Sequence, residues 1–206
     1  QAVTISPDNL LVTYPGTDTV HTQTIAGKAK GPDYSLGKDS QVSAISFSPD
    51  KGYLAAGLSD GRVLVWDRAT LKLILAILPG QTNGSNPVTA LEWSPNDNYL
   101  AVGSQKALNV YRVSLTGGAR VVNTPISQGL KTPLTALRFS QNSNLVAAGN
   151  QDGEMQVWSI DQARVVEQVS LGAGAVLSLN FKEGERQVFV LKGGNSPAFI
   201  TYNLQQ

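Results

Sequence analysis

The chain lacks residues on which much protein chemistry depends. Its 206 residues include no cysteine, and His21 is the only histidine. The missing cysteine excludes disulfide bonds, thiolate catalysis and cysteine-based metal sites. A single histidine also excludes a histidine-based metal cluster. We therefore predict that the protein uses no cofactor and no metal ion.

Long apolar runs and clusters of one charge are also missing. The longest apolar run, LKLILAIL at 71–78, is too short to span a membrane. The net charge is +1 and no run of lysine or arginine stands out, so we expect no nucleic acid partner. No signal peptide precedes Gln1 and no methionine begins the chain, so we interpret the sequence as a piece of a longer protein.

What the sequence does contain is a repeat. A short apolar segment followed by a polar turn occurs five times, with an anchor residue at Ile5, Phe47, Trp93, Phe139 and Phe181. The anchors are spaced by 42, 46, 46 and 42 residues. This is the period of a four-stranded propeller blade, so each unit is predicted to form one sheet.

Each unit has the same internal order of strands and turns. After the anchor and its turn comes a second strand, such as YLAAG at 53–57, and then a tight Asp-Gly turn at Asp60-Gly61 or Asp152-Gly153. Glycine accepts the positive φ that such turns require. A third strand follows, such as RVLVWD at 62–67, and its continuous apolar residues favour a strand that is covered on both faces. Helical periodicity is almost absent, so we expect little helix.

The quoted residues resemble the WD-repeat (WD40) propeller family over nearly the whole chain. The resemblance is strongest where Asp60-Gly61 precedes Trp66-Asp67 and where Asp152-Gly153 precedes Trp158. The family's Gly-His pair is missing, and Ala56 and Ala148 stand where the family has a hydroxyl. We therefore expect the two turn aspartates to find other donors, such as backbone N–H groups of the turn. The repeat-defining positions are Phe47, Trp66, Trp93, Phe139, Asp152, Trp158 and Phe181.

The predicted fold class is an all-β WD40-type β-propeller with five visible blade units. We place the units approximately at 1–41, 42–87, 88–133, 134–175 and 176–206, with the last blade incomplete. Because a closed ring leaves few exposed edges, either a distant segment completes it or the chain is part of a larger ring of about seven blades.

The turns between second and third strands should gather on one face of the ring, together with the links between blades. The resemblance implies that this face receives partners. The mixture of charges on it favours a protein or peptide over nucleic acid. The candidate partner-binding residues are Lys38, Asp39, Asp60, Arg62, Lys106, Lys131, Glu154 and Lys192. The alternative for most of them is an ordinary solvated surface.

Four other features carry weaker hypotheses. His21 falls in a predicted third strand, where we expect a packing or rim residue, and a catalytic histidine is the alternative. Gly172 and Gly174 form half of a dinucleotide-binding fingerprint, but Leu177 stands at the third glycine and no helix follows. Asn83-Gly84-Ser85 is a glycosylation acceptor sequence in a loop. The segment 71–78 is a predicted outer strand that either docks a partner or packs between blades.

The sequence thus predicts a non-catalytic platform for protein–protein interaction within a larger protein or complex, which could also dock to further blades or domains of the same polypeptide. Two alternatives stay open. One is a structural wall or spacer in a large assembly without regulated binding. The other is a propeller-borne hydrolase, because a fold does not fix a function.

Overall fold

The computed structural model describes residues 3–50, 52–77, 86–105, 107–114, 120–126, 130, 132–182, 184–195 and 197–204. Within these ranges the protein consists of nineteen strands and turns, without a helix. Accordingly, no helix of the described residues is long and apolar enough to cross a membrane. The prediction of an all-β chain is confirmed.

The strands form five separate antiparallel sheets, each built from consecutive strands. The first sheet contains β1 (Thr4–Ile5), β2 (Leu11–Pro15), β3 (Thr19–Thr24) and β4 (Tyr34–Ser35). The second contains β5 (Val42–Phe47), β6 (Tyr53–Leu58), β7 (Val63–Asp67) and β8 (Leu73–Ile77). The third contains β9 (Val88–Trp93), β10 (Tyr99–Ser104), β11 (Leu108–Ser114) and β12 (Arg120–Ile126).

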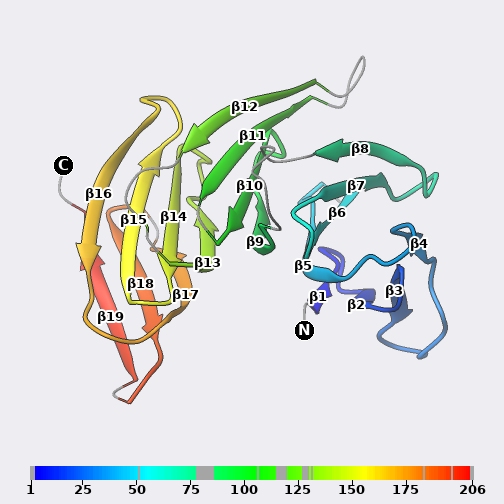
Figure 1. Ribbon diagram of the computed structural model, residues 1–206, viewed down its shortest axis with the longest axis horizontal. Coiled ribbons are helices and arrows are strands. Elements are labelled where there is room, and N and C mark those ends of the chain that lie inside the picture. Colours follow the sequence, from blue (N-terminus) through cyan, green and yellow to red (C-terminus); the bar gives the residue numbers. More distant parts are fainter. Residues whose placement is uncertain are drawn as a thin grey trace.

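The last two sheets follow the same order. The fourth contains β13 (Leu134–Phe139), β14 (Leu145–Asn150), β15 (Glu154–Ser159) and β16 (Arg164–Ser170). The fifth has three strands, β17 (Val176–Phe181), β18 (Gln187–Lys192) and β19 (Ala198–Asn203). Figure 1 shows the sheets arranged as an arc, with the first strands β5, β9, β13 and β17 toward its inside and the first and fifth sheets at its two ends.

An irregularity recurs at the start of four inner strands. In β5 the pairing register shifts between Val42 and Ala44, and in β9 it shifts next to Val88. In β13 the shift lies between Leu134 and Ala136, and in β17 it lies between Val176 and Ser178. A bulge of this kind re-aims the side chain next to it. The repeat therefore turns one apolar residue per sheet toward the preceding sheet.

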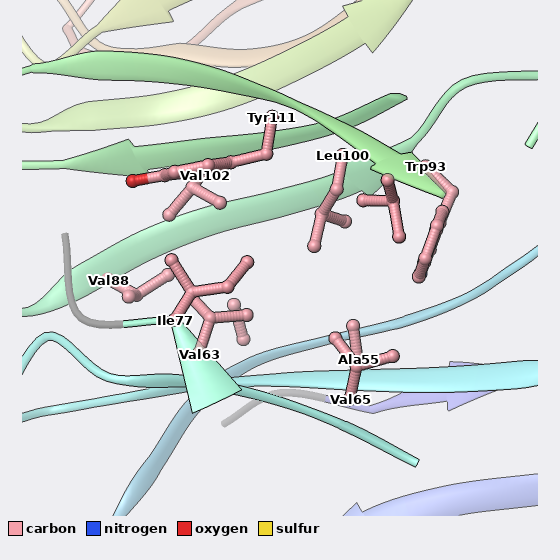
Figure 2. Packing of buried hydrophobic residues seen from close by; sticks show 11 residues of the cluster. Ala55, Val63, Val65, Ile77, Val88, Trp93, Leu100, Val102 and Tyr111 are labelled. Atoms are coloured by element: carbon pink, nitrogen blue, oxygen red, sulfur yellow. The ribbon is translucent and has the colours of Figure 1, made fainter. Parts of the chain in front are cut away.

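The sheets pack face to face through a match of large and small side chains. A Cβ added to Gly57, Gly103 or Gly149 would press on the first-strand residue of the next sheet, which is Val88, Leu134 or Val176 respectively. Glycine is thus required in the second strand because a branched side chain from the next sheet occupies the space. Figure 2 shows this junction between the second and third sheets, where Ala55, Val63 and Val65 face Val88, Trp93 and Leu100.

A buried serine closes the turn after four of the first strands. The Ser94 hydroxyl accepts a hydrogen bond from the Tyr99 N–H at 2.9 Å and donates to Asn96 Oδ1 at 2.8 Å. Ser6, Ser48 and Ser140 make the equivalent pair of bonds, and all four serines are at most 1% exposed. In the sequence pattern Ser-x-Asp or Ser-x-Asn, the buried serine therefore fixes the conformation of the turn by hydrogen bonds.

The same turns also bond the second, third and fourth sheets to the sheet that follows each. The N–H of Asp50 donates to Asp97 Oδ1, that of Asn96 to Ser143 Oγ, and that of Asn142 to Glu185 Oε1. The three acceptors have φ of 57°, 65° and 58°, which points their side chains back along the arc. We call this side of the molecule the hairpin face. It is defined by the described residues of the turns at 6–10, 48–52, 94–98, 140–144 and 182–186.

Candidate partner-binding face

The opposite side of the molecule gathers the turns between second and third strands and the links between sheets. Each turn bonds to the link that precedes its own sheet: the Ser59 N–H donates to Gln41 O, the Gln151 N–H to Pro133 O and the Gly193 N–H to Ala175 O. We call this side the connector face, defined by turns 59–61, 151–153 and 193–194 and by links 36–41 and 171–175. Its predicted gathering on one side is confirmed.

Arg62 ties one turn to one link on this face. Its Nε lies 2.7 Å from Asp60 Oδ2, and its guanidinium donates to Ser40 Oγ at 2.9 Å. Ser40 is buried and its N–H donates to Asp18 Oδ1, so the link is held from both sides. The structure therefore brings Asp60 and Arg62 beside the segment that carries Lys38 and Asp39.

The turn at Asp60 has the backbone that the sequence predicted. Asp60 Oδ1 accepts the Arg62 N–H at 3.0 Å, which confirms the expectation of a turn donor. Gly61 has φ of 92°, and a Cβ there would lie 2.9 Å from Asn86 O. Glycine is therefore required both by the backbone conformation and by the link to the third sheet.

The equivalent turn of the fourth sheet is organised by Asn150. Its Oδ1 accepts the N–H groups of Asp152 and Glu154, and its Nδ2 donates to Glu154 Oε2 at 2.7 Å. Asn150 is fully buried, whereas Asp152 is exposed and Glu154 is half-buried. Glu154 is thus fixed in place at the edge of the connector face.

Lys192 stands at the position of Asn150 in the fifth sheet. It is only 8% exposed, and its Nζ donates to Leu171 O at 2.9 Å. Around it the chain is packed with glycine, because a Cβ at Gly153 would collide with Gly172 O and one at Gly174 with Gly193 O. Lys192 therefore fixes the 171–175 link, and Gly172 and Gly174 serve close packing between two sheets.

The exposed charges of the described connector face are few and of both signs. Lys38, Asp39, Asp60 and Asp152 are exposed, and Arg62 and Glu154 are half-buried. Lys106 and Lys131 lie outside the described residues, as does Asn83-Gly84-Ser85. The described charges therefore form a mixed surface supported by a fixed backbone.

The repeat-defining positions divide between core and surface. Phe47, Trp66, Trp93 and Phe139 are buried, and Trp158 and Phe181 pack partly buried against the core. Asp152 is exposed on the connector face.

His21 lies in β3, the third strand of the first sheet. Its Nδ1 is 2.9 Å from Asp33 Oδ1, and Lys30 Nζ is 2.8 Å from the other oxygen of Asp33. The Lys30 and His21 hydrogen bonds hold the pKa of Asp33 below its usual value. The group is an open ion cluster, and within the described residues no set of three His, Asp or Glu side chains could hold a metal ion.

The strand predicted at 71–78 is β8, the outermost strand of the second sheet. Ile77 is buried and Ile74 and Leu75 pack partly buried against the core, whereas Leu73 is 51% exposed. One face of the strand therefore packs within the propeller, and Leu73 leaves a small apolar surface outside.

The structure adds an ion pair that the sequence interpretation did not single out. Arg138 Nη1 lies 3.0 Å from Glu92 Oε1 and joins the inner strands β13 and β9. Burial raises the pKa of Glu92 to about 7, although Arg138 acts in the opposite direction. Both residues directly precede an anchor, so opposite charges at this position of successive repeats were the signal that could have revealed the pair.

The inner strands line two open cavities along the centre of the arc. One, of about 560 Å³, lies toward the hairpin face and is lined by Phe47, Trp93, Glu92 and Arg138 among others. The other, of about 390 Å³, is lined by the first halves of the same strands, including Ser43, Thr89 and Thr135.

Comparison with known families identifies WD repeats in two parts of the chain. Residues 91–184 match the family described as the anaphase-promoting complex subunit 4 WD40 domain, and residues 32–67 match the WD domain, G-beta repeat. No curated protein sequence matches the chain significantly.

Solved structures share the fold. A chain of the mitotic checkpoint complex superposes with a TM-score of 0.81 at 17% identity, covering 99% of this chain and 60% of that chain. The Cps50 (Swd1) β-propeller domain of Myceliophteria thermophila gives a TM-score of 0.76 at 16% identity, covering 93% of this chain and 62% of that one. The chain thus spans about three fifths of either structure.

Proposed function

Because the chain belongs to the WD-repeat β-propeller family, whose domains are scaffolds for protein interaction, we propose that it is a non-catalytic platform that binds a protein or peptide partner. The partner contacts the connector face, and the platform works within a larger protein or complex. The observation that carries this proposal is the Arg62 bridge, which holds exposed charges on a fixed backbone at the edge of two sheets.

The chemistry of the connector face supports a polypeptide partner. Its exposed groups have both signs, and its turns are fixed by hydrogen bonds before any partner arrives. A pre-organised surface loses little conformational entropy on binding, and charges of both signs select among polypeptides by complementarity. The residues proposed to contact the partner are Lys38, Asp39, Asp60, Arg62 and Glu154.

Charge reversal on the connector face tests the proposal. The natural protein would be used as bait in a quantitative pull-down from its own cells, with Lys38→Glu and Asp39→Lys as variants. Both side chains are exposed, but Asp39 has φ of 58°, so the unfolding curve of each variant is compared with that of the natural chain to separate loss of contact from loss of the fold. Lys182→Glu, an exposed charge on the hairpin face, is the matched control. A stoichiometric partner that the first two variants lose and the control keeps is the expected result.

A partner retained by both variants would move the contact away from the connector face. No partner in any sample would contradict the platform and favour the structural alternative, a wall or spacer in a large assembly. That alternative is supported by one observation, the exposed Leu73 on the outer strand β8. Retention of a partner by Lys38→Glu but its loss on Leu73→Ser would establish contact at β8 instead.

A further inference from the structure

The first strands of the five sheets contain only two ionisable residues. The strands β1, β5, β9, β13 and β17 otherwise consist of apolar and uncharged polar residues, and the exceptions are Glu92 and Arg138. The other three strands have threonine, serine or asparagine at the same position before the anchor, so the repeat itself does not require a charge there. The pair is therefore a particular feature of the space between β9 and β13.

Arg138 lies where the two cavities of the arc meet. Both cavities are lined by Ile45, Leu91 and Arg138, so they form one continuous groove along β5, β9 and β13 (Figure 1). We call it the inner-strand groove. Each of these strands has six residues, and at about 3.4 Å per residue the groove is about 20 Å long. An extended polypeptide segment of about six residues has the same length.

Arg138 offers unused hydrogen-bond donors to this groove. Its side chain is 46% exposed, against 19% for that of Glu92. Among the described residues Glu92 is its only hydrogen-bond partner, through Nη1, so Nε and Nη2 have no acceptor there. Guanidinium donors of this kind bind a carboxylate through two parallel hydrogen bonds. Glu92 thus holds one nitrogen of the guanidinium, and the other two are available to an acidic group of a ligand.

The rest of the groove wall favours uncharged groups on either side of that acid. Within the described residues, Glu92 and Arg138 are the only charged members of the wall, and the aspartates of the nearby hairpin turns, Asp8, Asp50 and Asp97, line neither cavity. A further ligand charge would lose hydration without gaining a partner. Toward the connector face the wall has three hydroxyl side chains, those of Ser43, Thr89 and Thr135.

We propose that the inner-strand groove binds an extended segment of a protein partner, in which one aspartate or glutamate bonds to Arg138 and uncharged residues flank it. This inference rests on the proposed platform function and adds to it a second contact, separate from the connector face. The connector face presents several charges of both signs, whereas the groove selects one carboxylate at one position.

Glu92 makes this contact depend on pH. Burial raises the pKa of Glu92 to about 7, and the only histidine, His21, lies in β3 and outside the groove wall. Protonated Glu92 leaves the charge of Arg138 uncompensated, whereas ionised Glu92 neutralises it and repels a second carboxylate. The protonated fraction falls about tenfold from pH 6 to pH 8, so the affinity for the acidic segment should fall about tenfold as well.

Two peptide libraries test the proposal on the purified natural protein. One contains blocked pentapeptides with glutamate at the centre and varied uncharged residues at the other four positions, and the matched library has glutamine at the centre. Peptides retained at pH 6 are identified by mass spectrometry, and calorimetry measures their dissociation constants. We expect retention from the glutamate library only. Arg138→Gln should weaken binding by about tenfold or more, and Arg186→Gln, at an exposed arginine outside the groove, should not.

Glu92→Gln keeps the test decisive even where Arg138→Gln disturbs the fold. The variant has no carboxylate at this position, so at pH 8 it should bind the selected peptides about tenfold more tightly than the natural protein does. At pH 6 the two proteins should bind alike. A gain in affinity does not arise from loss of structure, and its absence at pH 8 would show that the acid of the peptide does not lie beside Glu92 and Arg138.

Three further results would overturn the proposal. They are equal retention of the two libraries, unchanged affinity on Arg138→Gln in a folded protein, and no retained peptide at pH 6. None of them bears on the connector face, because the pull-down with Lys38→Glu reports that contact by itself. Conversely, a platform that binds no partner at the connector face would leave the peptide affinities of the groove unchanged.

Discussion

The turns of the hairpin face and the junctions between sheets both recur in successive repeats, but they use different residues to do so. At the turns every one of four repeats uses the same chemistry, a buried serine that holds one N–H and one neighbouring side chain. At the junctions a glycine of the second strand faces a larger side chain of the next sheet, which is leucine at Gly103 and valine at Gly149. Turn geometry is therefore repeated within this chain by identical residues, and packing by a match of small and large side chains.

The largest effect on stability is expected where a glycine that faces a large side chain of the next sheet is replaced. Gly149→Leu places a side chain against Val176 and should lower the free energy of unfolding by about 3 kcal/mol or more. Leu191→Ala, at the same register position in the fifth sheet, where the side chain is exposed, should cost less than about 1 kcal/mol. Urea unfolding measures both. Equal effects would mean that the two positions do not differ in packing.

The Glu92–Arg138 pair extends the comparison of turns and junctions to a polar contact between two inner strands. The pKa of Glu92 is raised from 4.5 to about 7 in the folded chain. Between these pH values the folded state holds a proton that the unfolded state releases, so stability falls as pH rises and the loss is complete above pH 7.

Glu92→Gln should remove this pH dependence. At pH 8 the variant should be more stable than the natural chain by about 2 kcal/mol, and near pH 4 the two should agree. Unfolding curves at both pH values check the difference. A variant less stable than the natural chain at pH 8 would show that attraction to Arg138 outweighs the burial of the carboxylate.

Removing a turn serine should lower the stability of the chain by a smaller amount. Ser94→Ala leaves the part-buried Tyr99 N–H without its acceptor and should destabilise the chain by about 1–2 kcal/mol. Lys182 holds the same position in the fifth sheet and is exposed, so Lys182→Ala should change the midpoint of thermal unfolding very little. If both variants behave alike, the serine bonds contribute nothing beyond solvent contacts.

The smallest stability effect is expected on the connector face. Arg62→Ala removes an exposed ion pair and one hydrogen bond, and should cost about 0.5 kcal/mol or less. Its more informative readout is faster hydrogen exchange at Ser40, whose link would lose one of its two attachments. Unchanged exchange there would mean that Asp18 alone holds the link.

The sequence predicts the repeat because turns and anchors depend on local chemistry. The anchors Phe47 and Trp93, the Asp60-Gly61 turn and the outer strand β8 lie where the 46-residue period places them. The match of Gly149 to Val176 is invisible in one repeat, because it joins positions of different repeats and different strands. Lys192 illustrates the same limit, since a lysine in a turn suggests exposure but its ammonium bonds to a backbone carbonyl of a neighbouring link.

The hydrogen bonds from each hairpin turn to the next one bear on how the chain folds as it is synthesised. They connect residues 47, 47 and 43 positions apart, which is about one repeat. Because the second, third and fourth sheets are each bonded to their immediate successor, order can spread along the chain one sheet at a time, without waiting for its far end. On a ribosome each sheet would thus acquire its support as soon as one further repeat has emerged, and hydrophobic surface would be exposed over no more than one repeat at a time.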